Sequence, residues 1–332
     1  MDIGLLLTNQ LPTLVGVVVG VPLAIAAYIV GGEYLIRLLP DRTQGSVRPW
    51  LWVGPALFFV TVFLVAPAVL TVRQSMLNRV NDFVGFDNYA TILGNFPSGG
   101  VWPAIRDNLY WLVLYTLFVL FFGILLAVLS DRVPYESPVK SLIFMPMAIS
   151  FVALGVIWKF MYSYQPPSAP QTGTLNAIVT GIFHANPINW LPDKRFNNFA
   201  LIAAAVWGFT GFAMVILSAA LKGIPGELLE AARVDGAGEI TIFRRVIFPL
   251  LMPTVTVVAT TLVIFALKAF DVVYVMTNGN YDTDVLANRM YKELFNFGNP
   301  GRSGAVAVIL LIAVIPVLIS NLRQFRQVEA RR

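Results

Sequence analysis

The chain has 332 residues, of which 57% are hydrophobic and only 12% are charged. This composition, with a mean hydropathy of +0.74, lies outside the range of soluble globular domains and indicates a membrane protein. The net charge of +5 is then explained by membrane topology and lipid contact, and it gives no support to a nucleic-acid partner. Because the chain has no cysteine, thiolate chemistry and disulfide bonds are excluded.

Seven apolar runs are close to the length that a membrane-spanning helix needs, about twenty residues. They lie at roughly residues 10–32, 50–72, 108–130, 141–162, 198–221, 249–272 and 303–320. Several runs contain proline, which favours helices packed against neighbours that satisfy the freed carbonyl groups. We therefore predict an all-α membrane protein with about seven transmembrane helices.

The segments between these runs predict the domain organisation. A polar linker, "RLLPDRTQGSVRPW", follows the first run, so residues 1–49 read as an extra N-terminal helix with its linker. Residues 50–320 then form a six-helix transmembrane core, followed by a basic tail at 321–332. The segment 163–197 is rich in proline, asparagine and glycine, which predicts an ordered loop with one short helix.

The orientation follows from the basic residues of the loops. More than half of the 23 lysines and arginines lie in loops 31–49, 131–140 and 222–248 and in the tail 321–332. This side is predicted to be cytoplasmic, which places the C-terminus in the cytoplasm and the N-terminus outside. The segment 163–197 is then extracytoplasmic.

The connector 222–248 differs from its surroundings because it mixes charged with small residues. Pro225 and Glu227 predict a helix start, and Asp235 with Gly236 predicts a break. A second short helix should begin at Glu239, before a proline opens the sixth span. Taken alone, the pattern fits either an amphipathic connector in the membrane interface or a small-residue surface that docks into another protein.

The residues of this connector resemble the EAA signature of importer permeases of the ATP-binding-cassette (ABC) family. The matching positions are Glu230, Ala231, Ala232, Asp235, Gly236, Ala237, Phe243 and Pro249. The segments "INWLPDKR" (188–195) and "FDVVYVMTNG" (270–279) are similar to the carbohydrate branch, which includes the maltose and glycerol-phosphate permeases. The segment "VLANRMYKELF" (285–295) most resembles the α-glucoside permeases.

The resemblance implies a division of labour in a bacterial inner membrane. Two permease chains, expected to differ, would form the pathway, and an external binding protein would deliver the sugar. Two ATPase subunits would each grip one EAA loop, with Glu230 anchoring the joint and Gly236 allowing the bend. The chain has no GxxxxGK[ST] phosphate loop, so ATP and Mg would be used by the partner ATPase and no cofactor is expected here.

A sugar pathway is expected near the bilayer midplane, which span five reaches at about residues 209–210. Aromatic rings and hydrogen-bonding groups are the side chains that a sugar site needs. The candidates are Trp158, Trp207, Phe209, Thr210, Phe212, Phe265, Lys268 and Asp271. Ordinary helix packing is the alternative for the aromatic residues, and snorkelling or an i, i+3 ion pair is the alternative for the last two.

Two rival functions remain open at this point: a membrane-embedded enzyme acting on lipid-linked sugars, and an ion-coupled secondary transporter. The enzyme would need acids converging in one cavity, whereas the loop acids are scattered over both sides. The transporter would need carboxylates in mid-span, and none lies near a span centre. His184 is the only histidine, which leaves little room for a metal cluster or a Ser-His-Asp triad. The tryptophans at 102, 111 and 190 are expected in interfacial belts.

Overall fold

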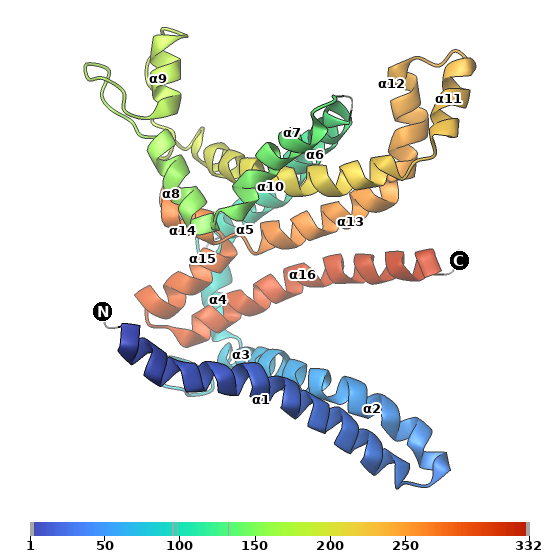
Figure 1. Ribbon diagram of the computed structural model, residues 1–332. Coiled ribbons are helices and arrows are strands. Elements are labelled where there is room, and N and C mark those ends of the chain that lie inside the picture. The colour runs from blue at the N-terminus through green and yellow to red at the C-terminus, as the bar shows by residue number, and fades with distance from the viewer. Residues whose placement is uncertain (1–2, 95, 98, 132, 330–332) are drawn as a thin grey trace. The chain divides into compact units, whose positions relative to one another are not determined.

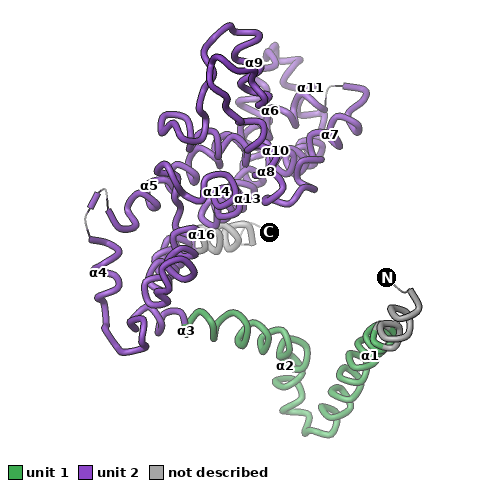
Figure 2. The backbone as a smooth tube through the Cα atoms, turned by 90° about the vertical axis from the view of Figure 1, so that its left-hand side faces the viewer, with its two compact units in different colours: residues 1–70 green, residues 71–332 purple. Residues whose placement is uncertain are grey.

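The computed structural model describes residues 3–94, 96–97, 99–131 and 133–329. These residues form helices and loops, with one isolated β-bridge between Leu77 and Phe83 (Figure 1). They fall into two compact units, residues 1–70 and 71–332 (Figure 2). Six helices are long and apolar enough to cross a membrane, or up to seven if a strongly bent pair counts as one span. The predicted all-α membrane fold is confirmed.

Unit 1 is built around a helical hairpin. Helix α1 (Ile3–Arg37) and helix α2 (Asp41–Val60) are joined by a short turn. Arg48 forms an ion pair of 2.6 Å with Glu33 across the hairpin. Because α2 already begins at Asp41, most of the predicted polar linker is helical, and the predicted boundary between residues 49 and 50 falls inside a helix.

The second span is one long helix with a local change of hydrogen bonding. Helix α2 continues through a π-helical turn, Thr61–Val65, into α3 (Ala66–Gln74). A π turn contains one extra residue and rotates the helix faces on its two sides relative to each other. Similar turns recur at Trp111–Tyr115, Phe243–Ile247 and Lys292–Asn296.

Unit 2 contains the remaining helices. In chain order they are α4 (Asp87–Leu93), α5 (Trp102–Tyr110), α6 (Thr116–Ser130), α7 (Glu136–Phe144), α8 (Phe151–Met161), α9 (Thr174–Gly181), α10 (Asn197–Lys222), α11 (Gly226–Val234), α12 (Glu239–Ile242), α13 (Phe248–Leu267), α14 (Asp271–Met276), α15 (Leu286–Tyr291) and α16 (Pro300–Glu329).

Helix α10 lies at the centre of unit 2. It packs against α6, α7, α13 and α14, and most of its small residues are buried. A Cβ atom placed on Gly123 of α6 would lie 2.6 Å from the Cβ of Ala213 on α10. Small residues therefore let the two backbones approach closely, as is common between helices in membranes.

The predicted fourth span, at 141–162, is broken in the structure. Helix α7 ends in a 3₁₀ turn, Met145–Ala148, and α8 departs at an angle of 100°. Pro146 has no backbone N–H to continue an α-helix, and Ile149 and Ser150 are extended. The Ser150 hydroxyl then accepts a hydrogen bond of 3.2 Å from the Ala153 N–H and caps α8. The predicted span therefore corresponds to a strongly bent pair of helices and not to one continuous helix.

The loop 163–197 is ordered and contains one short helix, α9, as predicted. Its central residue is Asn176, which is fully buried. The Asn176 side chain accepts from the Ile188 N–H (2.9 Å) and from Trp190 Nε1 (3.2 Å), and it donates to the Ser163 carbonyl (3.0 Å). One amide thus holds three segments of the loop together.

Candidate coupling hairpin and substrate cavity

The EAA residues form a compact helical hairpin made by α11 and α12. Helix α11 begins at Gly226 after Pro225, the break follows Asp235, and α12 begins at Glu239, all as predicted. The Gly236 N–H donates to the Arg233 carbonyl, and the Ala237 N–H donates to the Ala232 carbonyl, both at 3.0 Å.

These two bonds define a Schellman C-cap, which needs a residue in the left-handed conformation. Gly236 supplies it with a φ of +79°. A side chain here would strain the backbone, so the sharp turn between the two helices depends on this glycine. Arg233 and Glu239 join the helices by an ion pair of 3.2 Å.

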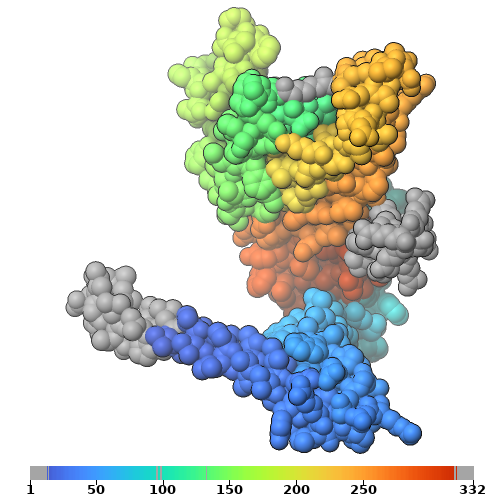
Figure 3. Space-filling model, turned by 45° about the vertical axis from the view of Figure 1, so that its right-hand side comes forward, coloured from blue at the N-terminus to red at the C-terminus, as the bar shows by residue number. Residues whose placement is uncertain are grey.

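The hairpin stands out from the surface of unit 2 (Figure 3). Every residue of α11 is at least partly exposed, including Glu230 and Ala231. Two large apolar side chains, Val234 and Ile240, are almost fully exposed on the same hairpin. An exposed apolar surface on a small, well-capped hairpin is typical of a site that another protein covers.

The second helix of the hairpin is continuous with span six. It runs from Glu239 through the π turn Phe243–Ile247 into α13 and ends at Leu267, a length of 29 residues. Pro249 lies in the first turn of α13, where the sixth span was expected to begin, but the helix enters α13 from α12 without a break. Proline lacks the N–H that an α-helix requires, and the altered bonding of the π turn just before it accommodates that loss.

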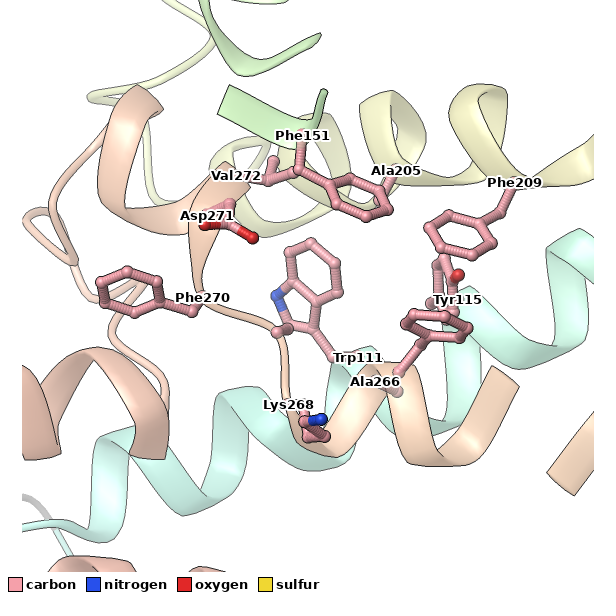
Figure 4. Close-up of a pocket in the computed structure, with 12 residues that line it drawn as sticks. Trp111, Tyr115, Phe151, Ala205, Phe209, Ala266, Lys268, Phe270, Asp271 and Val272 are labelled. Atoms are coloured by element: carbon pink, nitrogen blue, oxygen red, sulfur yellow. The ribbon is translucent and has the colours of Figure 1, made fainter. Parts of the chain in front are cut away.

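A cavity lies at the other end of this long helix (Figure 4). Its volume is about 220 Å³. The walls come from the Trp111–Tyr115 turn, from the start of α8, from α10, and from the end of α13 with the residues that follow. The lining residues are Trp111, Tyr115, Phe151, Ala205, Phe209, Phe265, Ala266, Lys268, Ala269, Phe270, Asp271 and Val272.

Phe209 is the centre of the aromatic wall. Its ring lies 5.0 Å from the Phe151 ring in a stacked arrangement, 4.6 Å from Phe265 and 5.8 Å from Tyr115, between ring centroids. These distances are those of favourable aromatic pairs. The rings come from four separate spans, so the cavity exists only when the spans are packed together.

Two polar atoms in the cavity wall lack a protein partner. Trp111 Nε1 and Tyr115 Oη are buried and have no hydrogen bond to any described residue. Buried N–H and O–H groups are almost always paired in native proteins, since leaving one unpaired costs about 1–3 kcal/mol. Both residues line the cavity, so the wall of the cavity contains two polar groups without a protein partner.

The predicted pathway residues divide into two groups. Phe209, Phe265, Lys268 and Asp271 line the cavity. Trp207 and Thr210 instead line an apolar groove between α6, α7 and α10, and the Thr210 hydroxyl donates to the Val206 carbonyl of its own helix. Trp158 packs against the Trp207 and Tyr162 rings, and Phe212 lies outside the cavity wall, beside Phe209.

Lys268 and Asp271 do not form the local ion pair that was one explanation for them. Helix α13 ends at Leu267, and Phe270 has non-helical angles before α14 begins at Asp271. The i, i+3 geometry is therefore lost, and neither side chain has an ion-pair partner among the described residues. Both charged groups remain available at the cavity.

Four aromatic residues of the cavity were not predicted as pathway residues: Trp111, Tyr115, Phe151 and Phe270. Trp111 was expected in an interfacial belt, but it is buried in the wall of the cavity. The signal that was available is its position one turn before Tyr115 on the same face of a helix. Phe151 could not be placed because the break before α8 was not foreseen.

Comparisons with known proteins agree on one family. Residues 119–331 match the family described as "Binding-protein-dependent transport system inner membrane component". The chain is 50% identical to the osmoprotective compounds uptake permease protein GgtC of Synechocystis, over 85% of this chain and 100% of the relative. It is 44% identical to the alpha-glucoside transport system permease protein AglF of Rhizobium meliloti, over 85% of this chain and 83% of the relative.

Among solved structures, a chain of a bacterial ABC transporter involved in the import of the acidic polysaccharide alginate has the same fold. The TM-score is 0.72 at 23% identity, and the match covers 86% of this chain and 99% of that chain. The relatives are transport components, not enzymes. The chain therefore belongs to the family of binding-protein-dependent transport system inner membrane components, as a permease subunit of an ABC importer.

Proposed function

We propose that this permease subunit imports a carbohydrate, with small α-glucosides as the leading substrate class. It would form half of the pathway beside a second, different permease chain. Two copies of a separate ATPase would use ATP and Mg, and an extracytoplasmic sugar-binding protein would deliver the substrate. In this arrangement the C-terminus and the hairpin lie in the bacterial cytoplasm and the N-terminus lies outside.

The continuous helix from Glu239 to Leu267 carries this proposal. One end belongs to the exposed EAA hairpin, and the other end contributes Phe265 and Ala266 to the cavity. A movement of the hairpin is thereby transmitted along a single rigid element to the wall of the cavity. The glutamate of the hairpin, Glu230, is the proposed anchor in the ATPase, and Gly236 sets the angle between the two helices.

Sugar is favoured as the substrate by the chemistry of the cavity. Sugar pockets combine aromatic faces, which stack on the C–H surface of a sugar ring, with a few placed hydrogen-bonding groups. The cavity offers Phe209 with three rings around it, and the unpaired Trp111 Nε1 and Tyr115 Oη. The names of several relatives, which mention alpha-glucosides, trehalose and maltose, or lactose, agree with this chemistry.

The proposed mechanism is alternating access, and it involves no covalent chemistry. Closure of the ATPases on ATP would draw the two hairpins together and tilt spans five and six, which adjoin the connector. The cavity would then open to the outside and accept the sugar from the binding protein. ATP hydrolysis would release the hairpins and open the cavity to the cytoplasm.

The test is reconstitution of the purified complex in proteoliposomes with maltose and trehalose as labelled substrates. We expect uptake that requires ATP, the ATPase and the binding protein. Glu230→Ala and Gly236→Pro should abolish uptake while the complex still inserts and hydrolyses ATP. Normal uptake by both variants would contradict the coupling role, and uptake driven by an ion gradient without the ATPase would favour a secondary transporter.

A further inference from the structure

Four aromatic rings continue from the cavity along α14, α15 and the π turn that follows. We call Phe270, Tyr274, Tyr291 and Phe295 the aromatic track. The ring centroids of Phe270 and Tyr274 are 5.2 Å apart in a stacked pair, and both rings contact Tyr291 at 5.5 and 5.2 Å. Tyr291 in turn contacts Phe295 at 4.7 Å. The contacts are continuous from the first ring to the last.

The track begins inside the cavity and ends at the surface. Phe270 is part of the cavity wall. Tyr274 is 38% exposed and Phe295 is 66% exposed. Aromatic residues that serve only to pack two helices together bury most of their area, since that burial is what stabilises the packing. Tyr274 and Phe295 instead keep exposed faces within a continuous row of rings, and a ligand can stack on such faces.

The middle of the track also offers hydroxyl groups. A hydrogen bond with Tyr274 raises the pKa of Tyr291, so the Tyr291 phenol remains protonated at physiological pH. Protonated phenols donate and accept hydrogen bonds, which suits the hydroxyl groups of a sugar. Lys268 and Asp271, on either side of Phe270 in the chain, add a donor and an acceptor at the entrance to the cavity.

The turn that carries Tyr291 and Phe295 is held rigidly. Glu293 is buried and pairs with Arg289 at 2.7 Å, and Lys292 pairs with Asp284 at 3.3 Å. The first pair lies within α15 and its π turn, and the second ties the π turn to the loop just before α15. A binding surface needs this kind of support, because side chains that are already ordered lose less entropy when the ligand binds.

We propose that the aromatic track is a second carbohydrate site, which receives an oligosaccharide at the surface and passes it ring by ring to the cavity. This inference rests on the proposed function. Its ligand class is a neutral oligosaccharide of pyranose rings, because the track offers stacking faces and phenol groups and no unpaired charge beyond Phe270. The rings of one oligosaccharide would occupy the track and the cavity at the same time.

The test measures maltotriose binding to the purified complex by calorimetry and maltotriose uptake by the same complex in proteoliposomes. Phe295→Ala and Tyr274→Ala remove one ring each and should weaken binding roughly threefold to tenfold, the range expected for one aromatic contact. Phe295→Tyr keeps the ring and should bind as the wild type does. Phe83→Ala is the matched control, since Phe83 is 75% exposed and lies outside the track.

The two proposals fail in different ways. If the wild type transports maltose and maltotriose but the ring-deleting variants bind maltotriose unchanged, the track proposal is overturned and the proposed function stands. If the wild-type complex takes up no α-glucoside, the proposed function fails and the track proposal fails with it. Weaker binding in Phe83→Ala of the same size would also overturn the track, because the loss would not depend on its rings.

Discussion

Helix α10 and the helices of unit 1 are similarly apolar, yet they differ completely in packing. In the most apolar window of α10, 72% of the residues are buried within the chain, whereas the corresponding share is 0% for the spans Val15–Arg37 and Asp41–Gln74. In a bilayer both kinds of helix are compatible with their surroundings, because lipid is as apolar as a protein core. Hydropathy therefore identifies a span but does not say what the span contacts.

The same difference between α10 and α1 is seen in the space around single glycines. A Cβ atom on Gly211 of α10 would lie 2.6 Å from the Ile143 carbonyl oxygen and 2.7 Å from Phe144 Cα. A Cβ atom on Gly16 or Gly20 of α1 would have no described atom within 4 Å. The sequence context of these glycines is alike, so the neighbouring helix, and not the glycine itself, decides whether a side chain is tolerated.

The largest effect is expected from placing a side chain at this contact. Gly211→Val should destabilise the protein by about 3 kcal/mol or more, since the atoms it meets belong to the backbone and cannot move aside. Gly20→Val in α1 should change the stability by less than about 0.5 kcal/mol. Thermal unfolding in detergent measures both. Equal destabilisation by the two substitutions would show that α1 is packed as tightly as α10.

The hairpin is the exception to the rule that exposed positions tolerate change. Gly236→Val would force a side chain to a φ of +79°, at a cost of roughly 1–2 kcal/mol, and would distort the Schellman cap. We expect uptake to fall at least about tenfold while ATP hydrolysis continues. The matched control is Gly238→Val, because Gly238 has an ordinary φ of −70° and open space around it. Equal loss of uptake in the two variants would mean that the cap geometry is irrelevant.

The cavity wall contains a buried position where a substitution should not destabilise the protein. Tyr115→Phe removes an unpaired hydroxyl, so the stability should stay the same or rise by about 1 kcal/mol. Maltose binding should nevertheless weaken roughly fivefold to tenfold, because a hydrogen bond to the sugar is lost. Melting and calorimetry on the same preparation separate the two effects.

Tyr162→Phe is the control for that experiment. Tyr162 is also buried, but its hydroxyl donates to the Ala200 carbonyl at 3.0 Å. Removing it should lower the stability by about 1 kcal/mol and leave sugar binding unchanged. If Tyr115→Phe behaved in the same way as Tyr162→Phe, the Tyr115 hydroxyl would have no role in sugar binding.

The smallest effect is expected at the ion pair of the hairpin. Arg233 and Glu239 are each more than half exposed, so solvent screens their attraction. Arg233→Gln should therefore change the stability by less than about 0.5 kcal/mol. A larger loss, measured against Arg244→Gln as an exposed arginine without an ion pair among the described residues, would show that the pair holds the two helices together.

Local signals explain which parts could be predicted from the sequence. The hairpin was predicted because its start, break and restart depend on residues within a few positions of each other, such as Pro225, Gly236 and Glu239. The cavity was only partly predicted, since Phe209 and Trp111 are almost a hundred residues apart and nothing in either span points to the other. The bend before α8 was missed because a straight helix and a broken helix can have the same apolar sequence pattern.

The length of the helix that joins the hairpin to the cavity determines how far its end moves when the helix tilts. With 29 residues at 1.5 Å each, it is about 43 Å long. If it pivots near the hairpin, a tilt of only about 5° displaces its far end by about 4 Å, in proportion to that length. A displacement of this size approaches the width of a sugar ring, so a subtle rotation of the hairpin would be enough to change the width of the cavity.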